Sequence, residues 1–349
     1  MTIKEIFKIA LEEKASDVHL VTDMPPMLRI DGELSSVDHE SPLPKKEMER
    51  LILSILDEEQ KNKFLNEKEL DISYQSDDAR FRINLFFERG NMGMVARVIS
   101  NKIPTVKDVE LPDIVTQLLN LKQGLILVTG PTGCGKSTTL AAMVDYLNSN
   151  FTYNIITLED PIEFMFEPKK SIIVQRQLGS DMLSFAEGLK HALRQDPNVI
   201  MVGEMRDLET IATTITLAET GHLVLATLHT YSAAQTIDRI IDIFPPHQQN
   251  QVRTQLSMTL AGVISQRLLQ KTNGGRIATR EIMINTPAVS NIIRENKIAQ
   301  LKTVIETNAK DGMVSMDQEI KKLFKEKIIT KEIAQAQMMN PELLEKIRA

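Results

Sequence analysis

Residues 130–137, Gly-Pro-Thr-Gly-Cys-Gly-Lys-Ser, have the residue types and spacing of a phosphate-binding loop. An apolar run at 125–128 precedes the loop, and a helical pattern at 138–147 follows it. This context predicts backbone amides that surround a polyphosphate at the positive end of a helix. The expected nucleotide-binding residues are Gly130, Pro131, Thr132, Gly133, Cys134, Gly135, Lys136, Ser137 and Thr138.

Three side chains of this loop carry specific expectations. Lys136 is expected to reach the β- and γ-phosphates of ATP, and the Ser137 hydroxyl is expected to ligate Mg²⁺. Cys134 stands near a helix N-terminus, which lowers a thiol pKa, so the sequence predicts a reactive thiol that bound nucleotide protects. The alternative to a nucleotide site is a chance match in a glycine-rich turn, and the correct flanks on both sides disfavour it.

Two acidic segments supply candidate groups for hydrolysis. The apolar run 198–204 ends in Gly203 and Glu204, a Walker B pattern with glycine where many such enzymes carry aspartate. Glu204 is therefore expected to serve Mg²⁺ or the attacking water. In the second segment, residues 155–164, Glu163 is expected to polarise the water, while Glu159 and Asp160 order the loop or help hold Mg²⁺. For the segment that ends in Glu204, the alternative is a core strand that happens to end in glutamate. For the segment with Glu163, the alternative is a polar loop.

Two histidines, His222 and His229, bracket a third apolar run. Their odd separation places the two rings on opposite faces of a regular strand, so a zinc ion shared between them is rejected. His229 is expected to sense the γ-phosphate, and His222 to hold structure or a subunit contact. The chain has one cysteine, which excludes a disulfide framework and a cysteine-based zinc site.

The elements that must position these groups alternate between strand and helix from the loop to about residue 230. This alternation predicts an α/β fold, a mainly parallel sheet with helices on both faces, and ligands at the carboxyl ends of the strands. The expected strands are 154–158, 172–175, 199–202 and 223–227, and the expected helices are 183–195 and 207–220.

About 100 residues of mixed strand and helix precede this region and predict a small α+β domain. Arg82 and Arg97 alternate with apolar residues in two of its strands. They form a solvated strand face, or they grip the γ-phosphate if the domain closes over the nucleotide. Residues 101–113 contain two prolines and no periodic apolar face, which is typical of a linker.

The region after Pro245 is expected to be mostly helical, with a first helix over 247–270 and one strand near 277–284. Shorter helices are expected at 287–295, 298–308, 315–326, 331–338 and 341–348. The predicted division has four parts: an N-terminal α+β domain at 1–100, a linker at 101–113, an ATPase core at 114–285 and a helical C-terminal region at 286–349.

Composition narrows the class of protein. The sequence is 42% hydrophobic and 25% charged, as in an ordinary globular protein. No apolar run approaches the roughly 20 residues that span a bilayer, and the start lacks a signal-peptide pattern, so we expect a cytoplasmic protein without direct membrane insertion. The net charge of −6 argues against non-specific nucleic-acid binding.

Together, these segments resemble the secretion ATPases of type II and type IV systems. Residues 130–137, 159–164, 199–204 and 221–229 match that superfamily's four motifs in order, and Gly203 is its usual form. The resemblance implies a RecA-like ATPase domain and a PAS-like N-terminal domain. Within the superfamily, the chain is similar to the motors that retract type IV pili. Three features point to these motors: a short N-terminal domain, no four-cysteine zinc module, and residues 288–295, similar to Ala-Ile-Arg-Asn-Leu-Ile-Arg-Glu apart from Val289 and Ser290.

What this resemblance implies is a homohexameric ring that uses ATP and Mg²⁺ to retract a pilus. It implies a partner, the pilus platform protein of the inner membrane, which holds the ring at the cytoplasmic face. Four alternatives share some of the residues: an extension or type II secretion motor, a DNA translocase, a small-molecule P-loop kinase, and a nucleotide-binding module without activity.

Overall fold

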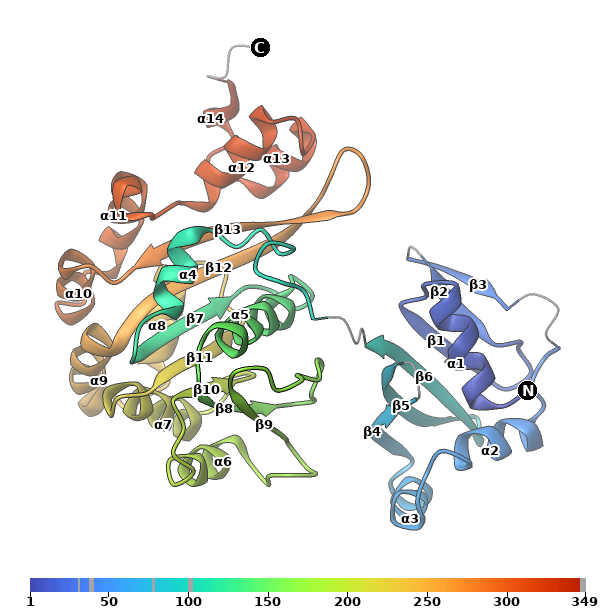
Figure 1. Cartoon of the computed structure of the whole chain (residues 1–349). Coiled ribbons are helices and arrows are strands. Elements are labelled where there is room, and N and C mark those ends of the chain that lie inside the picture. The colour runs from blue at the N-terminus through green and yellow to red at the C-terminus, as the bar shows by residue number, and fades with distance from the viewer. Residues whose placement is uncertain (31, 38–40, 77–78, 100–102, 346–349) are drawn as a thin grey trace. The chain divides into compact units, whose positions relative to one another are not determined.

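The computed structural model groups the chain into two units, residues 1–102 with 163–165, and residues 103–162 with 166–349 (Figure 1). The first residues of the predicted linker, 101 and 102, lie outside the described residues. Among the helices described, none is both long enough and apolar enough to cross a membrane. The structure describes all residues except 31, 38–40, 77–78, 100–102 and 346–349.

The N-terminal unit contains an antiparallel sheet with the strand order β3-β2-β1-β6-β5-β4. Its first helix begins at a capping box formed by Thr2 and Glu5, and it buries one apolar face. The predicted α+β character of this region is confirmed. The elements are α1 (Ile3–Glu12), β1 (Asp17–Leu20), β2 (Met27–Ile30), β3 (Glu33–Ser36), α2 (Lys45–Leu53), α3 (Glu58–Glu67), β4 (Glu69–Gln75), β5 (Arg80–Glu88) and β6 (Asn91–Ile99).

The second unit contains a sheet with the strand order β13-β12-β7-β11-β10-β8-β9. All neighbouring strands are parallel except β12 and β13, which form an antiparallel pair. The predicted, mainly parallel sheet is therefore confirmed. Its strands are β7 (Gly124–Thr129), β8 (Asn154–Glu159), β9 (Ile172–Gln177), β10 (Val199–Val202), β11 (Leu223–Leu228), β12 (Leu260–Gln270) and β13 (Arg276–Ile284).

Helices pack against both faces of this sheet. Leu125 and Leu127 of β7 share one buried cluster with residues of α7, α8 and α9. Side chains alternate along a strand, so Ile126 and Val128 face the other side, where α5 contacts β7. The helices of this part are α4 (Asp113–Leu119), α5 (Lys136–Asn150), α6 (Phe185–Ala192), α7 (Leu208–Glu219), α8 (Ala233–Asp242) and α9 (Pro246–Thr259).

The predicted helix over 247–270 is wrong in its second half. The helix ends at Thr259, and residues 260–270 form strand β12 beside the loop-bearing strand β7. A strand buried on both faces has a nearly continuous apolar sequence, which periodicity alone does not separate from a buried helix. The error matters because β12 contributes several side chains to the site.

The C-terminal region is helical, as predicted. Its elements pack partly on the sheet and partly in a separate cluster with Leu269 and Ile277 of the β12–β13 hairpin. The predicted helix at 341–348 is described only as far as Glu345. The elements are α10 (Pro287–Arg294), η1 (Ile298–Gln300), α11 (Leu301–Thr307), η2 (Ala309–Asp311), α12 (Met316–Lys325), α13 (Lys331–Gln337) and α14 (Glu342–Glu345).

Candidate nucleotide site

The glycine-rich loop joins the buried strand β7 to helix α5. Gly130, Gly133 and Gly135 have φ angles of 144°, 78° and 88°, which L-residues with side chains rarely adopt. Gly135 is the N-cap of α5, and no side chain caps the helix there. The first amides of α5 therefore remain available to an anion, as the sequence predicts.

The loop is closely packed against strand β12. A Cβ on Gly130 would lie 2.2 Å from the Gln266 carbonyl oxygen and 2.7 Å from Cys134 Sγ. A Cβ on Gly135 would lie 3.1 Å from Gln266 Nε2. These glycines are required by close packing as well as by backbone conformation, and β12 thus sets the shape of the loop.

Lys136 points back over the loop that carries it. Its Nζ donates to the carbonyl oxygens of Gly130 at 2.8 Å and Pro131 at 3.1 Å. The same Nζ lies 3.5 Å from Nδ1 of His229, at the carboxyl end of β11. The lysine is therefore held above the loop, in the region where the sequence expects phosphate.

His229 connects Lys136 to the Walker B acid. Its Nε2 lies 3.4 Å from Glu204 Oε2, and Glu204 Oε1 accepts from Arg206 Nη2 at 2.7 Å. An ammonium can only donate and a carboxylate only accepts, so one neutral tautomer, with a bare Nδ1 and a protonated Nε2, satisfies both contacts. The contacts run in series from Lys136 to His229, Glu204 and Arg206. They bring two predicted catalytic residues, His229 and Glu204, beside Lys136, the predicted phosphate ligand.

The end of strand β10 is fixed from two sides. Gly203 N donates to Leu158 O at 2.8 Å, and the buried Thr227 hydroxyl donates to Gly203 O. A Cβ on Gly203 would lie 3.1 Å from Leu158 O and 3.4 Å from Glu159 Cα. The lack of a side chain at Gly203 therefore lets β10 approach β8 closely, and Thr227 holds the peptide group that precedes Glu204.

Glu159, a predicted Mg²⁺ ligand, ends strand β8 and is 7% exposed. Its Oε1 accepts from the Thr157 hydroxyl at 2.7 Å and from Gln175 Nε2 at 3.1 Å. In the described part of the chain, no three or more His, Cys, Asp or Glu side chains form a group able to hold a metal ion. The Mg²⁺ set of Ser137, Glu159 and Glu204 stays a prediction.

The predicted reactivity of Cys134 is contradicted. The residue is 3% exposed, and burial raises the pKa of its thiol, although Lys136 and nearby backbone N–H groups act in the opposite direction. The sequence argument took account of the helix N-terminus but not of the desolvation imposed by β12. A buried thiol with a raised pKa is a packing residue of the loop.

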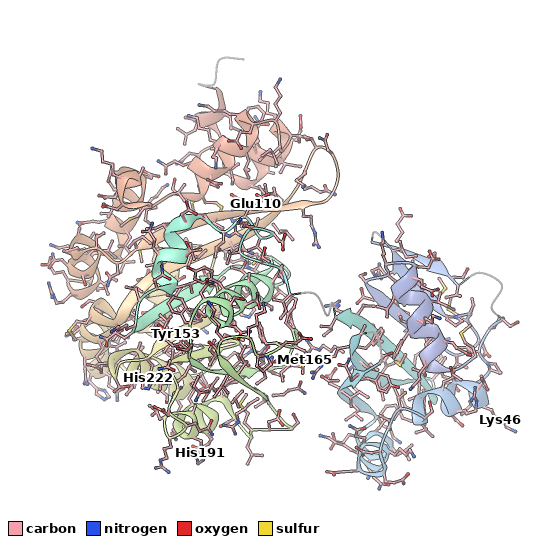
Figure 2. The ribbon with its side chains drawn as sticks, viewed as in Figure 1. Lys46, Glu110, Tyr153, Met165, His191 and His222 are labelled. Atoms are coloured by element: carbon pink, nitrogen blue, oxygen red, sulfur yellow. The ribbon has the colours of Figure 1, made fainter. Side chains whose placement is uncertain are left out.

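His222 lies at the start of β11, away from the loop, and is labelled in Figure 2. Its Nδ1 contacts Leu217 O at 3.0 Å and the Thr220 hydroxyl at 3.2 Å, at the end of helix α7. The sequence left two roles open for His222, a structural role and a subunit contact, and these contacts favour the structural role.

In the N-terminal unit, Arg82 and Arg97 are exposed and directly opposite each other on β5 and β6. Like charges directly opposite each other repel. The carboxylate of the buried Asp17 offsets part of this repulsion, because its Oδ1 accepts a hydrogen bond from Arg97 Nε at 2.9 Å. Glu163 also groups with this unit. The roles of Arg82, Arg97 and Glu163 at a phosphate therefore stay predictions.

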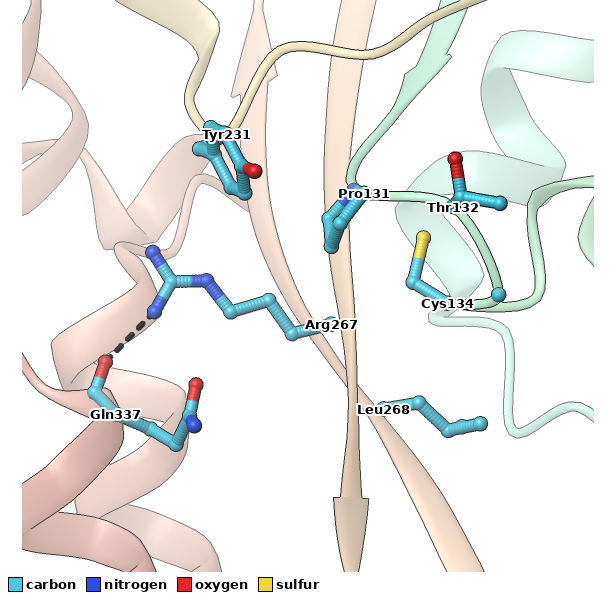
Figure 3. Close-up of a pocket in the computed structure, with 8 residues that line it drawn as sticks. Pro131, Thr132, Cys134, Tyr231, Arg267, Leu268 and Gln337 are labelled. Atoms are coloured by element: carbon cyan, nitrogen blue, oxygen red, sulfur yellow. Dashed lines mark hydrogen bonds between the residues drawn. The ribbon is translucent and has the colours of Figure 1, made fainter.

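A pocket of about 400 Å³ borders the outer side of the loop. Residues 131–134 form one wall, and Tyr231, Arg267, Leu268 and Gln337 form the others (Figure 3). Arg267 Nη1 donates to Gln337 O at 2.7 Å. The sequence did not indicate Arg267 because this part of β12 was predicted as a helix, and it did not indicate Gln337 because only the folded chain brings α13 to the pocket.

The arrangement as a whole fits a nucleotide polyphosphate. Open helix amides, inward-turned glycines and an ammonium group lie at the carboxyl ends of parallel strands. The Glu204 carboxylate contacts the His229 imidazole, which in turn contacts this ammonium group. This set can bind phosphate anions and can orient and deprotonate water.

The comparisons with known proteins agree with this chemistry. A family described as type II/IV secretion system protein matches residues 1–274. The type IV pilus retraction ATPase PilT of Pseudomonas aeruginosa is 46% identical over 343 residues, 98% of this chain and 99% of that protein. A twitching motility protein of Neisseria gonorrhoeae is 44% identical over 322 residues, covering 91% and 85%. A crystal structure of the pilus retraction motor PilT with bound ADP matches with a TM-score of 0.94 and 46% identity, covering 99% of this chain and 100% of that one.

Proposed function

Because this chain belongs to the family of type II/IV secretion system proteins, we propose that it is an ATPase that powers the retraction of type IV pili. The observation that carries this is the contact series from Lys136 through His229 to Glu204 in a chain similar to a retraction ATPase along nearly its whole length. Similarity over both units favours a retraction motor over extension and type II secretion motors, which share the catalytic motifs.

The chain's own residues divide the work at the site. The loop amides and Lys136 hold the phosphates, and Ser137, Glu159 and Glu204 would hold Mg²⁺, which neutralises phosphate charge when bound. Glu163 and Glu204 orient and polarise the attacking water. His229 links the state of Lys136 to Glu204, since its two ring nitrogens contact both groups.

The moving parts follow from the predicted four-part division. Arg82 and Arg97 grip the γ-phosphate from the N-terminal domain, 1–100, and release it after hydrolysis. The linker, 101–113, converts this change into rotation of the domain against the core, 114–285, and the helical region, 286–349. Six copies form a ring at the cytoplasmic face of the inner membrane, and the ring passes the motion to the pilus platform protein.

Replacement of Lys136 tests this function. We expect Lys136→Ala to abolish most phosphate release from ATP, because an ammonium that neutralises phosphate charge is lost. A strain with this variant should carry excess pili and lose twitching motility. Lys190→Ala is the matched control, since Lys190 forms only exposed ion pairs with Glu187 and Glu209. Normal turnover in Lys136→Ala would contradict the site, and loss of pili would favour an extension motor.

A further inference from the structure

A buried chain of hydrogen bonds leaves the loop through Gln266 of β12. Gln266 Nε2 donates to Cys134 O at 2.6 Å, inside the loop. Gln266 Oε1 accepts from the Thr139 hydroxyl of α5 at 2.8 Å and from Arg280 Nε at 3.1 Å. Gln266 is 2% exposed, so water does not replace these partners.

Arg280 of β13 extends the chain to the segment that follows the first unit. Its Nη2 donates to Val109 O at 2.7 Å, and its Nη1 donates to Glu110 O at 3.0 Å. Figure 2 labels Glu110 beside the β12–β13 hairpin. Arg280 is 4% exposed, and this burial lowers its pKa to about 10, so the guanidinium remains charged at neutral pH.

The receiving segment is a tight, sequence-local turn. Leu111 N donates to Val106 O and Glu110 N donates to Lys107 O, the two bonds of a Schellman motif. Glu110 has a φ of 48°, in the left-handed region that a non-glycine residue adopts at a cost. The guanidinium bonds the carbonyls of Val109 and Glu110 at the end of this turn, so Arg280 helps to hold the turn in place.

The donors and acceptors in this chain of hydrogen bonds fix its direction and restrict rotation of the Gln266 side chain. Arg280 and the Thr139 hydroxyl both donate to Gln266 Oε1, so the amide nitrogen must face Cys134 O. Rotation of the Gln266 side chain would leave at least one buried group without its hydrogen-bond partner, which is unfavourable. The hydrogen bonds of Gln266 therefore link the position of the Cys134 carbonyl to that of Arg280.

We propose that Gln266 and Arg280 are positioning residues that transmit the conformation of the glycine-rich loop to the turn formed by residues 105–111. This inference rests on the proposed function, since nucleotide is what changes the loop. Residues 105–111 lie within the predicted linker. The chain of hydrogen bonds thus offers a route, within one unit, from the nucleotide site to the segment that leads to the other unit.

Amide hydrogen exchange in the full-length protein, with and without ADP and Mg²⁺, tests the proposal. In the wild type, we expect ADP to change the exchange of Val109, Glu110 and Leu111 at least about fivefold. In Arg280→Gln, this response to ADP should disappear, kcat should fall about fivefold or more, and the Kd of ADP should change less than about threefold. In Gln266→Ala, which also removes the donor to Cys134 O inside the loop, the response should disappear as well. Arg280→Lys should restore part of the response, because an ammonium reaches fewer of the three acceptors.

The controls separate transmission from simple loss of structure. Arg276→Gln removes an exposed arginine at the first position of β13, four residues before Arg280, and should leave the response unchanged. A merely structural role for Arg280 would change exchange equally with and without ADP, and this result would overturn the proposal. So would a wild type that hydrolyses ATP without any response in the turn. A wild type that does not hydrolyse ATP would instead overturn the proposed function.

Discussion

Replacement of Glu204 by Gln separates the chemistry of the site from its stability. The variant keeps the size of the side chain and an oxygen acceptor but removes the negative charge. Glu204 Oε1 pairs with Arg206 at 2.7 Å, and Oε2 lies 3.4 Å from His229. We expect a stable protein that binds nucleotide and releases phosphate very slowly.

The two expected magnitudes differ widely. The Arg206 side chain is 73% exposed, so the ion pair contributes only about 0.2–1 kcal/mol to folding. A carboxylate that accepts a proton from the attacking water contributes about 10²–10⁴-fold to the rate. The predicted result is a nearly unchanged free energy of unfolding with a loss of at least about 100-fold in kcat.

Phosphate release at saturating ATP and a urea unfolding curve measure the two quantities on the same preparation. Arg206→Gln is the matched control because it removes the same ion pair and leaves the carboxylate in place. Its kcat should fall less than about tenfold. Turnover of Glu204→Gln within about tenfold of the wild type would refute the assignment. An equal loss in both variants would show that the charge on Glu204 is not what matters.

Two further predictions follow from burial. Cys134 should react slowly with iodoacetamide in the native protein, with or without Mg-ATP, because the thiol is buried and burial raises its pKa; rapid labelling of native protein near neutral pH would contradict this. Glu281 caps the backbone amide of Ala233 at 2.8 Å, and burial raises the pKa of its carboxyl above the ordinary value of a glutamate. The native state then holds the proton more tightly than the unfolded chain, so the free energy of unfolding should fall as pH rises from the ordinary pKa of a glutamate through the raised pKa. Glu281→Gln should lack this fall in urea unfolding between about pH 4 and about pH 8, and a pH-independent difference between the two proteins would contradict the reasoning.

Local chemistry made the loop and its flanking elements predictable from the sequence. Glycine spacing, Lys136 and the apolar run before them lie within about 15 residues of one another, so their structure depends little on the rest of the chain. The acid of the Walker B strand was predictable for the same reason. The contacts of His229 with Lys136 and Glu204 follow from the strand order β7-β11-β10, which the sequence did not give, because alternation of strand and helix indicates parallel strands but not their order.

Groups that depend on distant packing were not predictable in this way. The sequence around Cys134 indicates an open helix end, and only the position of β12 shows that the thiol is desolvated. The sequence also gives no signal for Thr227 as the donor to Gly203, since a threonine at a strand end is common. Arg280 stands next to Glu281 in strand β13, and charged neighbours of this kind usually lie on a solvated strand face, so the sequence gives no signal that Arg280 is buried.

Strand β12 shows why one wrong assignment hid several functional candidates at once. Successive side chains of a strand face opposite sides, so Gln266 meets the loop and Arg280, while Arg267 meets the pocket and the carbonyl of Gln337. On a helix, neighbouring residues project only about 100° apart, and this division would be lost. Because β12 pairs directly with β7, its two faces connect the phosphate-binding loop to the linker turn on one side and to the C-terminal helices on the other. The same two faces imply that substitutions at 266 and at 267 affect different parts of the protein, although the residues are adjacent in sequence.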